Sequence, residues 1–369
     1  MWNPERYDRQ VKLQNFGIHA QEKLTSARIL VIGAGGLGCP VLQYLTAAGV
    51  GNIGITDDDL VSLSNLHRQV LYTSDDIGTL KTEAAFKRLG AMNPEVAFDI
   101  ISARITTKNA IRMISDYDLI LDCSDNFPTR YLLDDACRLM KKPLIFGAVY
   151  QYEGQVAVFN VPDKHGRTTN YRHLFPEPPK PGEVPDCNDA GVLGVLPGMI
   201  GSIQAAEAIK LITGTGEPLI NKLMTINMLD YQTAVFGIPY EDPVNADIPS
   251  TVEEFEKMNY EQHCGILQDG IKNISPLVFK EASKLPDTLI IDVREPDEHP
   301  KLKVPYIAIP LSQLKQRFSE IHSRSIILVC QSGKRSLAGA LILQELAGPD
   351  ITISHLEGGI QNLNQEINE

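Results

Sequence analysis

The 369-residue chain has few cysteines, one tryptophan and no long uninterrupted run of apolar residues. Its six cysteines are scattered from Cys39 to Cys330, which excludes the dense disulfide framework of small secreted domains and fits a reducing compartment. The longest apolar stretches, such as Val192–Ile203, are too short to span a bilayer and are interrupted by glycine and proline. The charged first residues, Met1–Gln10, lack the apolar segment of a secretory signal. We therefore expect a soluble, cytoplasmic protein.

Positive charge is also scarce, since 34 Lys and Arg stand against 46 Asp and Glu, a net charge of −12. An acidic field repels nucleic acid and anionic lipid, so we expect neither nucleic acid nor membrane as a partner. The content of 43% hydrophobic and 22% charged residues is that of an ordinary globular protein. At roughly 150 residues per domain, the length predicts two or three domains.

The first part of the chain alternates between strands and helices. Strands are expected at Ala27–Ile32, Asn52–Asp57, Asp118–Cys123, Leu144–Val149 and Gln155–Asn160, and helices at Leu37–Ala48 and Pro128–Met140. The polar–apolar alternation of Gln155–Asn160 predicts an antiparallel strand. A strand, a glycine turn, a helix and a second strand ending in an acid are typical of a nucleotide-binding unit.

A proline-rich stretch and an acidic linker divide the rest. Five prolines between Pro176 and Pro185 predict that 168–186 is a long surface loop. A helix over Met199–Ile212 and a strand at Leu223–Leu229 follow, and 239–262 is a linker with room for a short helix. Strands at Thr288–Val293 and Ser325–Cys330 and a helix at Leu337–Leu346 then restart the pattern. The prediction is two α/β domains, 1–240 and 272–369, joined by a linker at 241–271.

The glycine turn predicts a phosphate site. Without Cβ atoms, Gly33, Gly35, Gly36 and Gly38 allow backbone N–H groups and a helix N-terminus to approach phosphate closely. Asp57, 19 residues after Gly38, suits a ribose hydroxyl. These residues alone favour an NAD-dependent dehydrogenase, which we keep as an alternative.

The residues that follow favour a nucleoside triphosphate. Attack on an α-phosphate needs several cations, which Arg68 and Lys81 supply, and Asp125 at a strand end suits Mg²⁺. Each charged residue alone would be an ordinary solvated side chain, but their order favours a site. Nucleotide binding is therefore assigned to Gly33, Gly35, Gly36, Gly38, Asp57, Asp59, Asn65, Arg68, Gln69, Lys81, Asp125 and Asn126.

Over about residues 5–235 the chain resembles the ubiquitin-activating (E1-like) superfamily, and within it the MoeB/ThiF group. The matching segments are Arg6–Gln10, Gly33–Gly38, Val61–Gln69, Lys81 and Cys123–Asn126. The resemblance implies a Rossmann-like domain with a mixed sheet that uses ATP to adenylate the C-terminal glycine of a small ubiquitin-fold sulfur carrier. It implies ribose binding by Asp57, phosphate binding by Asn65, Arg68 and Lys81, and Mg²⁺ binding by Asp125.

The resemblance also implies catalytic residues beyond the nucleotide contacts. Arg9 matches the arginine that reaches into the partner subunit's site, which implies a homodimer. Together with Arg68 and Lys81 it would neutralise the two anions that the reaction brings together, and an ionised carboxylate needs no general base. Cys187 matches a cysteine implicated in thioester or persulfide linkage to the carrier, although an ordinary loop cysteine is the alternative.

One departure concerns zinc, which family members commonly hold in two Cys-X-X-Cys pairs. Asn170 and His173 stand at the first pair, and no second pair follows near the end of the domain. The spacing of His173, His263 and Cys264 is no recognised tetrahedral set, so we expect no zinc and a more mobile 168–186 loop.

The second domain resembles a rhodanese over about residues 272–365. Its Cys-X-X-Gly-X-Arg-Ser loop is Cys330, Gln331, Ser332, Gly333, Lys334, Arg335 and Ser336, and Ile290–Pro296 and Leu356–Ile360 match two further rhodanese segments. A cysteine between a strand and a helix N-terminus, beside cations, holds an anionic sulfur well, although a buried strand-end cysteine is the alternative. Residues 301–309 and the C-terminus, without the usual tryptophan, depart from the family. The Cys-X4-Arg spacing is one residue shorter than that of related phosphatases, which favours sulfur transfer.

Together the two domains predict adenylation followed by displacement of AMP by a persulfide on Cys330, which leaves a thiocarboxylate on the carrier. The expected partners are a carrier ending in Gly-Gly and a persulfide donor such as a cysteine desulfurase. Molybdenum cofactor synthesis is the favoured pathway; thiamine thiazole, tRNA thiolation and cysteine synthesis are alternatives. A catalytically inactive E1-like adaptor is a non-enzymatic alternative.

Overall fold

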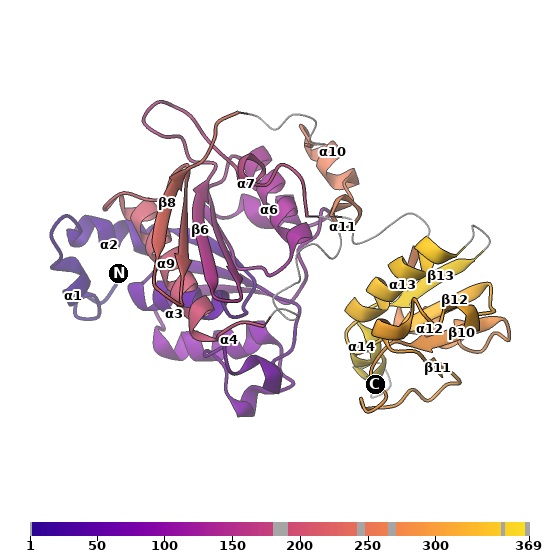
Figure 1. The fold of residues 1–369 in the computed structure, drawn as a ribbon. Helices are drawn as coiled ribbons and strands as arrows, with labels where there is room; N and C mark the ends of the chain where they lie inside the picture. The colour runs from indigo at the N-terminus through magenta and orange to yellow at the C-terminus, as the bar shows by residue number, and fades with distance from the viewer. Residues whose placement is uncertain (1, 180–190, 242–247, 265–270, 348–350, 366–369) are drawn as a thin grey trace. The chain divides into compact units, whose positions relative to one another are not determined.

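The computed structural model describes residues 2–179, 191–241, 248–264, 271–347 and 351–365 (Figure 1). The chain divides into two compact units, Met1–Tyr260 and Glu261–Glu369. Each unit is built around its own sheet, and each is described here by itself.

The sheet of the first unit has eight strands in the order β3-β2-β1-β4-β5-β6-β7-β8. They are β1 (Arg28–Ile32), β2 (Asn52–Thr56), β3 (Ala97–Ile101), β4 (Leu119–Asp122), β5 (Leu144–Tyr150), β6 (Glu153–Phe159), β7 (Lys222–Asn227) and β8 (Thr233–Gly237). The first five in this order pair in parallel, and the β5–β6, β6–β7 and β7–β8 pairs are antiparallel. The mixed sheet confirms the predicted fold class. Strand order reverses between β1 and β4, where ligands bind in sheets of this type.

Helices cover both faces of this sheet. They are α1 (Asp8–Val11), α2 (Gly17–Ser26), α3 (Gly38–Ala48), α4 (Lys81–Met92), α5 (Ala110–Ser115), α6 (Phe127–Met140), α7 (Tyr171–Leu174), α9 (Val195–Thr213), α10 (Val252–Lys257) and α11 (Tyr260–His263). Figure 1 shows α2 and α9 on one side of β6 and α6 and α7 on the other. The α9 side shares one apolar core with β1, β2, β5 and β6, while the α6 side is built around aromatic rings such as Tyr131, Phe146 and Tyr171.

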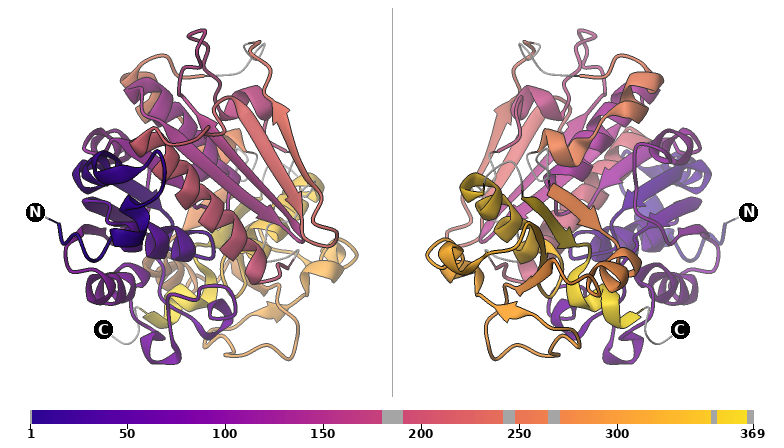
Figure 2. Two further views of the ribbon diagram at one scale, coloured as in Figure 1. Left: turned by 90° about the vertical axis from the view of Figure 1, so that its left-hand side faces the viewer. Right: turned by 90° about the vertical axis from the view of Figure 1, so that its right-hand side faces the viewer.

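Helix α9 lies along one face of the sheet, as the left view of Figure 2 shows. It packs on α2, α3, β5 and β6. With 19 residues it extends beyond the apolar stretch Val192–Ile203, and it is long and apolar enough to cross a membrane by length and composition alone. Its apolar side chains pack in the core of this unit, and this packing explains why the helix is so apolar.

The segment predicted as a surface loop, 168–186, is partly buried, so that prediction is wrong for Thr169–Arg172. Asn170 caps α7 by accepting a hydrogen bond from the backbone N–H of His173, and Arg172 is fully buried. Residues 180–186 lie outside the described residues. Inside the predicted linker, 241–271, helix α10 and the start of α11 pack against the first unit through Phe255 and Tyr260.

The second unit has a parallel five-stranded sheet in the order β11-β10-β12-β13-β9. The strands are β9 (Ile271–Ile274), β10 (Thr288–Asp292), β11 (Ile307–Ala308), β12 (Ser325–Val329) and β13 (Thr352–Leu356), and the helices are α12 (Pro276–Ala282), α13 (Lys334–Leu346) and α14 (Gly359–Gln365). Two apolar clusters line its two faces. Central strand β12 ends directly before Cys330.

Candidate functional site

The glycine turn joins β1 to α3 at the point where the strand order reverses. Gly33 has a φ of +94°, and a Cβ on it would lie 2.8 Å from the carbonyl oxygen of Cys123 at the end of β4. A Cβ on Gly38 would overlap the carbonyl oxygen of Gly33. The turn therefore needs glycine at both ends, and it leads directly into the N-terminus of α3.

The carboxylate of Asp57, directly after β2, is tied to this turn. One oxygen accepts the backbone N–H of Ala34 at 2.8 Å and the other that of Asp59 at 2.9 Å. Burial raises the pKa of Asp57, and the charge of Lys81 opposes that shift. Each oxygen keeps a lone pair for a further donor, as a ribose hydroxyl would supply.

Lys81, at the start of α4, faces the same carboxylates. Its ammonium lies 2.7 Å from Asp59 and 3.8 Å from Asp57, and the side chain is almost completely buried. Burial would lower the pKa of Lys81, but the charges of Asp57, Asp59 and Asp125 raise it. A buried ammonium is thus held beside the glycine turn.

Arg68 and Gln69 also lie beside the turn, and the Arg68 guanidinium donates to the Ser64 carbonyl at 3.1 Å. A Cβ on Gly36 would lie 3.6 Å from the Arg68 side chain, and one on Gly35 would lie 3.6 Å from the Gln69 amide nitrogen. Gln69 is buried, and no described residue donates a hydrogen bond to its Oε1. Asn65, at the end of a 3-10 turn, accepts the backbone N–H groups of both residues through its carbonyl. A buried oxygen without a partner favours a ligand at this point.

The loop after β4 contributes Asp125 and Asn126. Asp125 is exposed, and its charge acts on Lys81. The side-chain oxygen of Asn126 caps α6 by accepting the backbone N–H of Thr129 at 3.0 Å, so its role toward a nucleotide stays a prediction. Buried Asp122, which the sequence did not single out, holds the loop by accepting from the backbone and hydroxyl of Ser124.

Arg9, a predicted catalytic residue, is not brought to the glycine turn of its own chain. Arg9 is exposed on α1, next to Gln10, which donates to Ala48 at the C-terminal end of α3. The glycine turn lies at the other end of that 11-residue helix, roughly 16 Å away at 1.5 Å per residue. Cys187 lies outside the described residues.

The positions compared with zinc ligands contact one another. The Nδ1 atom of His173 lies 2.7 Å from the side-chain oxygen of Asn170. In the described ranges, the one group of side chains that could share a metal ion is Asp57, Asp58 and Asp59. The expectation that zinc is absent stays a prediction.

The second site is the turn between β12 and α13. Cys330 is fully buried, and its Sγ accepts the backbone N–H of Gly333 at 3.1 Å and lies 3.5 Å from the Ser336 hydroxyl. Gly333 has a φ of +88° and Lys334 opens α13. Ile360, in the segment that follows β13, donates its backbone N–H to the Cys330 carbonyl at 2.9 Å. The sulfur thus accepts one backbone N–H in the turn that leads into the N-terminus of α13.

Carboxylates accompany both arginines of this turn. Buried Arg294 pairs with Asp292 at 2.8 Å and donates to the Gln331 side chain at 3.2 Å. Arg335 pairs with both oxygens of Glu298, at 2.5 and 2.8 Å. Glu298 was not predicted, because 37 residues separate it from Arg335 and only the fold joins them.

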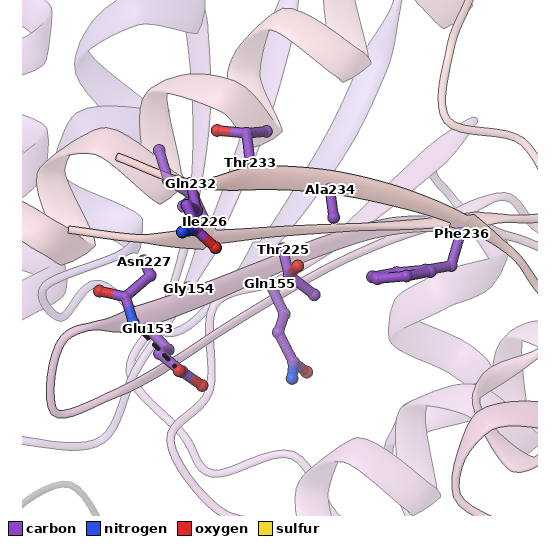
Figure 3. Close-up of a pocket in the computed structure, with 10 residues that line it drawn as sticks. All are labelled: Glu153, Gly154, Gln155, Thr225, Ile226, Asn227, Gln232, Thr233, Ala234 and Phe236. Atoms are coloured by element: carbon purple, nitrogen blue, oxygen red, sulfur yellow. Dashed lines mark hydrogen bonds between the residues drawn. The ribbon is translucent and has the colours of Figure 1, made fainter. Parts of the chain in front are cut away.

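A groove of about 460 Å³ lies elsewhere on the first unit, over β6, β7 and β8 (Figure 3). Its lining residues are Glu153, Gly154, Gln155, Thr225, Ile226, Asn227, Gln232, Thr233, Ala234 and Phe236. A Cβ on Gly154 would point at Ile200 of α9. Neighbouring positions in a strand face opposite sides of the sheet, so Gln155 and its cross-strand partner Thr225 point away from α9. The groove shares no residue with the glycine turn. The neighbouring hairpin exposes Leu229, Tyr231, Val235 and Phe236.

Family comparison covers both units. The ThiF family matches residues 7–244 and the rhodanese-like domain matches residues 275–366. The chain belongs to the ThiF family. The ThiF-family match contains the glycine turn, Asp57, Arg68 and Lys81, and the rhodanese match contains Cys330. The predicted order of a MoeB/ThiF-like domain and a rhodanese domain is confirmed.

Several relatives of this ThiF-family chain are enzymes. A sulfur carrier protein adenylyltransferase of Thermus thermophilus is 49% identical over 265 residues, 71% of this chain and 97% of the relative. The probable adenylyltransferase/sulfurtransferase MoeZ of Mycobacterium tuberculosis is 39% identical over 366 residues, 96% of this chain and 91% of MoeZ. The crystal structure of E. coli MccB with MccA-N7isoASN has the same fold, with a TM-score of 0.57 and 22% identity over 67% of this chain and 75% of MccB. The chain is therefore an adenylyltransferase with a sulfurtransferase domain.

Proposed function

We propose that this enzyme uses ATP to adenylate the C-terminal glycine carboxylate of a small ubiquitin-fold sulfur carrier and then replaces AMP by sulfur. The observation that carries the first step is the cluster of Asp57, buried Lys81 and Arg68 around the glycine turn. A dinucleotide needs few cations, whereas attack of an anion on an α-phosphate needs several. The name of the Thermus relative, a sulfur carrier protein adenylyltransferase, supports the choice of acceptor.

The site residues fit ATP. The glycine turn at the N-terminus of α3 suits phosphate, the free lone pairs of Asp57 suit ribose hydroxyls, and the unpaired Oε1 of Gln69 suits a ligand donor. Mg²⁺ would be held by the exposed carboxylate of Asp125, and it would screen the phosphate charge.

In the first step a carboxylate oxygen of the carrier attacks the α-phosphorus, and the bond from that phosphorus to the bridging oxygen breaks as pyrophosphate leaves. Lys81 and Arg68 stabilise the charge that spreads over the phosphate oxygens, and Arg9 acts from the partner subunit of a homodimer. Because the carboxylate is already ionised near neutral pH, no residue needs to remove a proton.

In the second step the terminal sulfur of a Cys330 persulfide attacks the acyl carbon, and AMP leaves with its phosphate oxygen. A thiolate, assigned to Cys187, then attacks the Cys330 sulfur of the acyl disulfide. The carrier leaves as a thiocarboxylate, and a disulfide remains between the two cysteines. Two external thiols reduce that disulfide and leave as a disulfide themselves, and a protein persulfide donor such as a cysteine desulfurase then transfers its outer sulfur to the Cys330 thiolate.

For the setting, we propose a cytoplasmic homodimer that serves molybdenum cofactor synthesis. The alternative pathways, thiamine thiazole, tRNA thiolation and cysteine synthesis, use the same chemistry.

The exposed apolar side chains of the β7–β8 hairpin are a surface suited to the carrier: Leu229, Tyr231, Val235 and Phe236.

The test is ATP–pyrophosphate exchange with and without a carrier ending in Gly-Gly. We expect carrier-dependent exchange that Arg68→Ala abolishes and Cys330→Ala retains. Thiocarboxylate formation is expected to be lost in both variants, because it needs the adenylate as well as the Cys330 sulfur. Absence of exchange with several such carriers would exclude the adenylation step and favour an adaptor. Full thiocarboxylate formation by Cys330→Ala would exclude its sulfur role.

A further inference from the structure

The two arginines beside Cys330 are each paired with a carboxylate. Arg335 is close enough to Cys330 for the two to interact electrostatically, and it is the partly exposed arginine of the turn, with a side chain 37% accessible. Both of its terminal nitrogens are paired with the two oxygens of Glu298. Arg294 is buried and paired with Asp292. Among the described side chains, the charge of each of these arginines is therefore already matched by a carboxylate.

Glu298 is held in place independently of Arg335. Its Oε1 also accepts the backbone N–H of Glu295 at 2.9 Å, so the turn that follows β10 fixes the carboxylate. A bidentate pair with a fixed partner is stronger and better ordered than an ordinary surface ion pair. The hydrogen bonds from Arg335 hold the pKa of Glu298 at about 2, so the carboxylate stays ionised at neutral pH.

Small and protein-bound sulfur donors make different demands on such a turn. Thiosulfate carries two negative charges on a compact group, and its sulfonate oxygens need a cation beside the attacked sulfur. A persulfide on a protein brings at most one negative charge, and the rest of that donor is held by protein contacts away from the turn.

We propose that Glu298 is a specificity-determining residue that excludes small dianionic sulfur donors and leaves the turn to protein-bound persulfides. The inference rests on the sulfur role proposed above for Cys330. Removing the carboxylate charge frees Arg335 for thiosulfate. In that reaction the Cys330 thiolate attacks the outer sulfur, the sulfur–sulfur bond breaks, sulfite leaves with the electron pair, and Cys330 becomes a persulfide. Cyanide then takes the outer sulfur as thiocyanate and restores the thiolate.

The experiment measures thiosulfate:cyanide sulfurtransferase activity of the full chain. Glu298→Gln keeps an oxygen for the Glu295 N–H and removes the charge. We expect it to raise kcat/KM for thiosulfate about tenfold, mainly through KM. The matched control is Glu320→Gln, which removes the same charge from an exposed pair with Arg317 in the same unit and is expected to change kcat/KM less than twofold. Glu298→Ala is the second variant, and thermal unfolding checks that each variant is folded.

A second assay loads Cys330 from labelled cysteine and a cysteine desulfurase, with Cys330→Ala as the blank. Loading of Glu298→Gln within twofold of the parent chain is expected. If both Glu298 variants leave thiosulfate turnover unchanged while the parent chain is loaded, the specificity role is wrong and the role of Cys330 stands. If the parent chain is not loaded above the blank, the proposed sulfur role itself is wrong. An equal gain in Glu320→Gln would reduce the effect to net charge and also overturn the inference.

Discussion

At the scale of single residues, the nucleotide site depends most on Asp57. Both of its oxygens accept backbone N–H groups, one of them from the glycine turn, so the same carboxylate shapes the turn and faces the ligand. An amide in its place would put an NH₂ group against one of these N–H donors.

We therefore expect Asp57→Asn to weaken ATP binding by about 100-fold, measured by titration calorimetry. The neighbouring Asp58→Asn, on an exposed side chain, is the matched control and is expected to stay within about threefold. Equal affinities of the two variants would contradict the role of Asp57.

Asp134, on α6, predicts a pH dependence of stability. Burial first, and then the charge of Asp135, raises its pKa to about 7. Between the unfolded value of 3.8 and about 7 the folded chain keeps a proton that the unfolded chain has released. Stability from this group is complete below pH 4 and is lost as the pH rises to about 7.

Asn matches the protonated form of Asp134 at every pH. The free energy of unfolding of Asp134→Asn, relative to that of the parent chain, is therefore expected to be about 2 kcal/mol higher at pH 8 than at pH 5. Urea unfolding at the two pH values measures this, and a constant difference would count against it.

Sequence reasoning grouped the residues of the nucleotide site better than those of the sulfur site. Asp57, Arg68 and Lys81 follow one another within a unit whose topology brings strand ends together, so order along the chain predicts proximity. Glu298 and Arg335 are far apart in the sequence, and only the fold brings them into contact. Asp134 lies on a helix with an amphipathic sequence, and it is buried because α7 packs over it.

At the scale of elements, a buried polar contact joins α6, α7 and α11. Arg172 donates to both oxygens of Asp135, at 3.0 and 2.7 Å, and the Tyr260 hydroxyl donates to the same carboxylate at 2.8 Å. Arg172 and Asp135 are fully buried. This contact holds the end of the first unit, where the chain leaves for the second.

Arg172→Met removes the bidentate guanidinium and leaves the buried Asp135 charge with Arg138 at 3.9 Å, and we expect a loss of about 3–5 kcal/mol in the free energy of unfolding. Lys12→Met, which removes an exposed pair with Asp8, is the control with an expected loss below about 1 kcal/mol. Urea unfolding measures both, and limited proteolysis is expected to cut 251–264 sooner in Arg172→Met. Similar losses in the two variants would show that the buried contact is not the stronger one.

Burial explains which elements the sequence predicted. The parallel strands β1, β2 and β4 are apolar on both faces and were placed within one or two residues of their ends. Strand β8 is largely exposed and was missed, and α7 was hidden in a proline-rich stretch, where its Asn170 cap is the one local signal.

At the scale of the whole molecule, the role proposed for Arg9 requires a dimer. It lies at the end of α3 away from the glycine turn of its own chain, so its proposed role needs the turn of a partner. The restart of the α/β pattern after the linker predicted a second domain, and both family matches follow that division. Contacts between two copies of a chain produce no comparable alternation of strands and helices, so they could not be predicted from that pattern.

Mixing two inactive variants tests this role. In a mixed dimer of Arg9→Ala and Arg68→Ala, one site keeps Arg68 and receives Arg9 from the other chain. Random pairing is then expected to restore about a quarter of the parent's carrier-dependent pyrophosphate exchange. If Arg9 acted within its own chain, exchange would stay at the level of the separate variants.

Helix α9 has a consequence for how the protein is made. The surfaces it packs on, α2, α3, β5 and β6, all precede it in the chain, so a ribosome has already released them when this apolar segment emerges. The order of synthesis therefore lets earlier elements cover a 19-residue helix that, by its length and composition alone, resembles a membrane-spanning segment. A circular permutant beginning at α9 would reverse that order and present the helix to the cell's targeting machinery before anything could cover it.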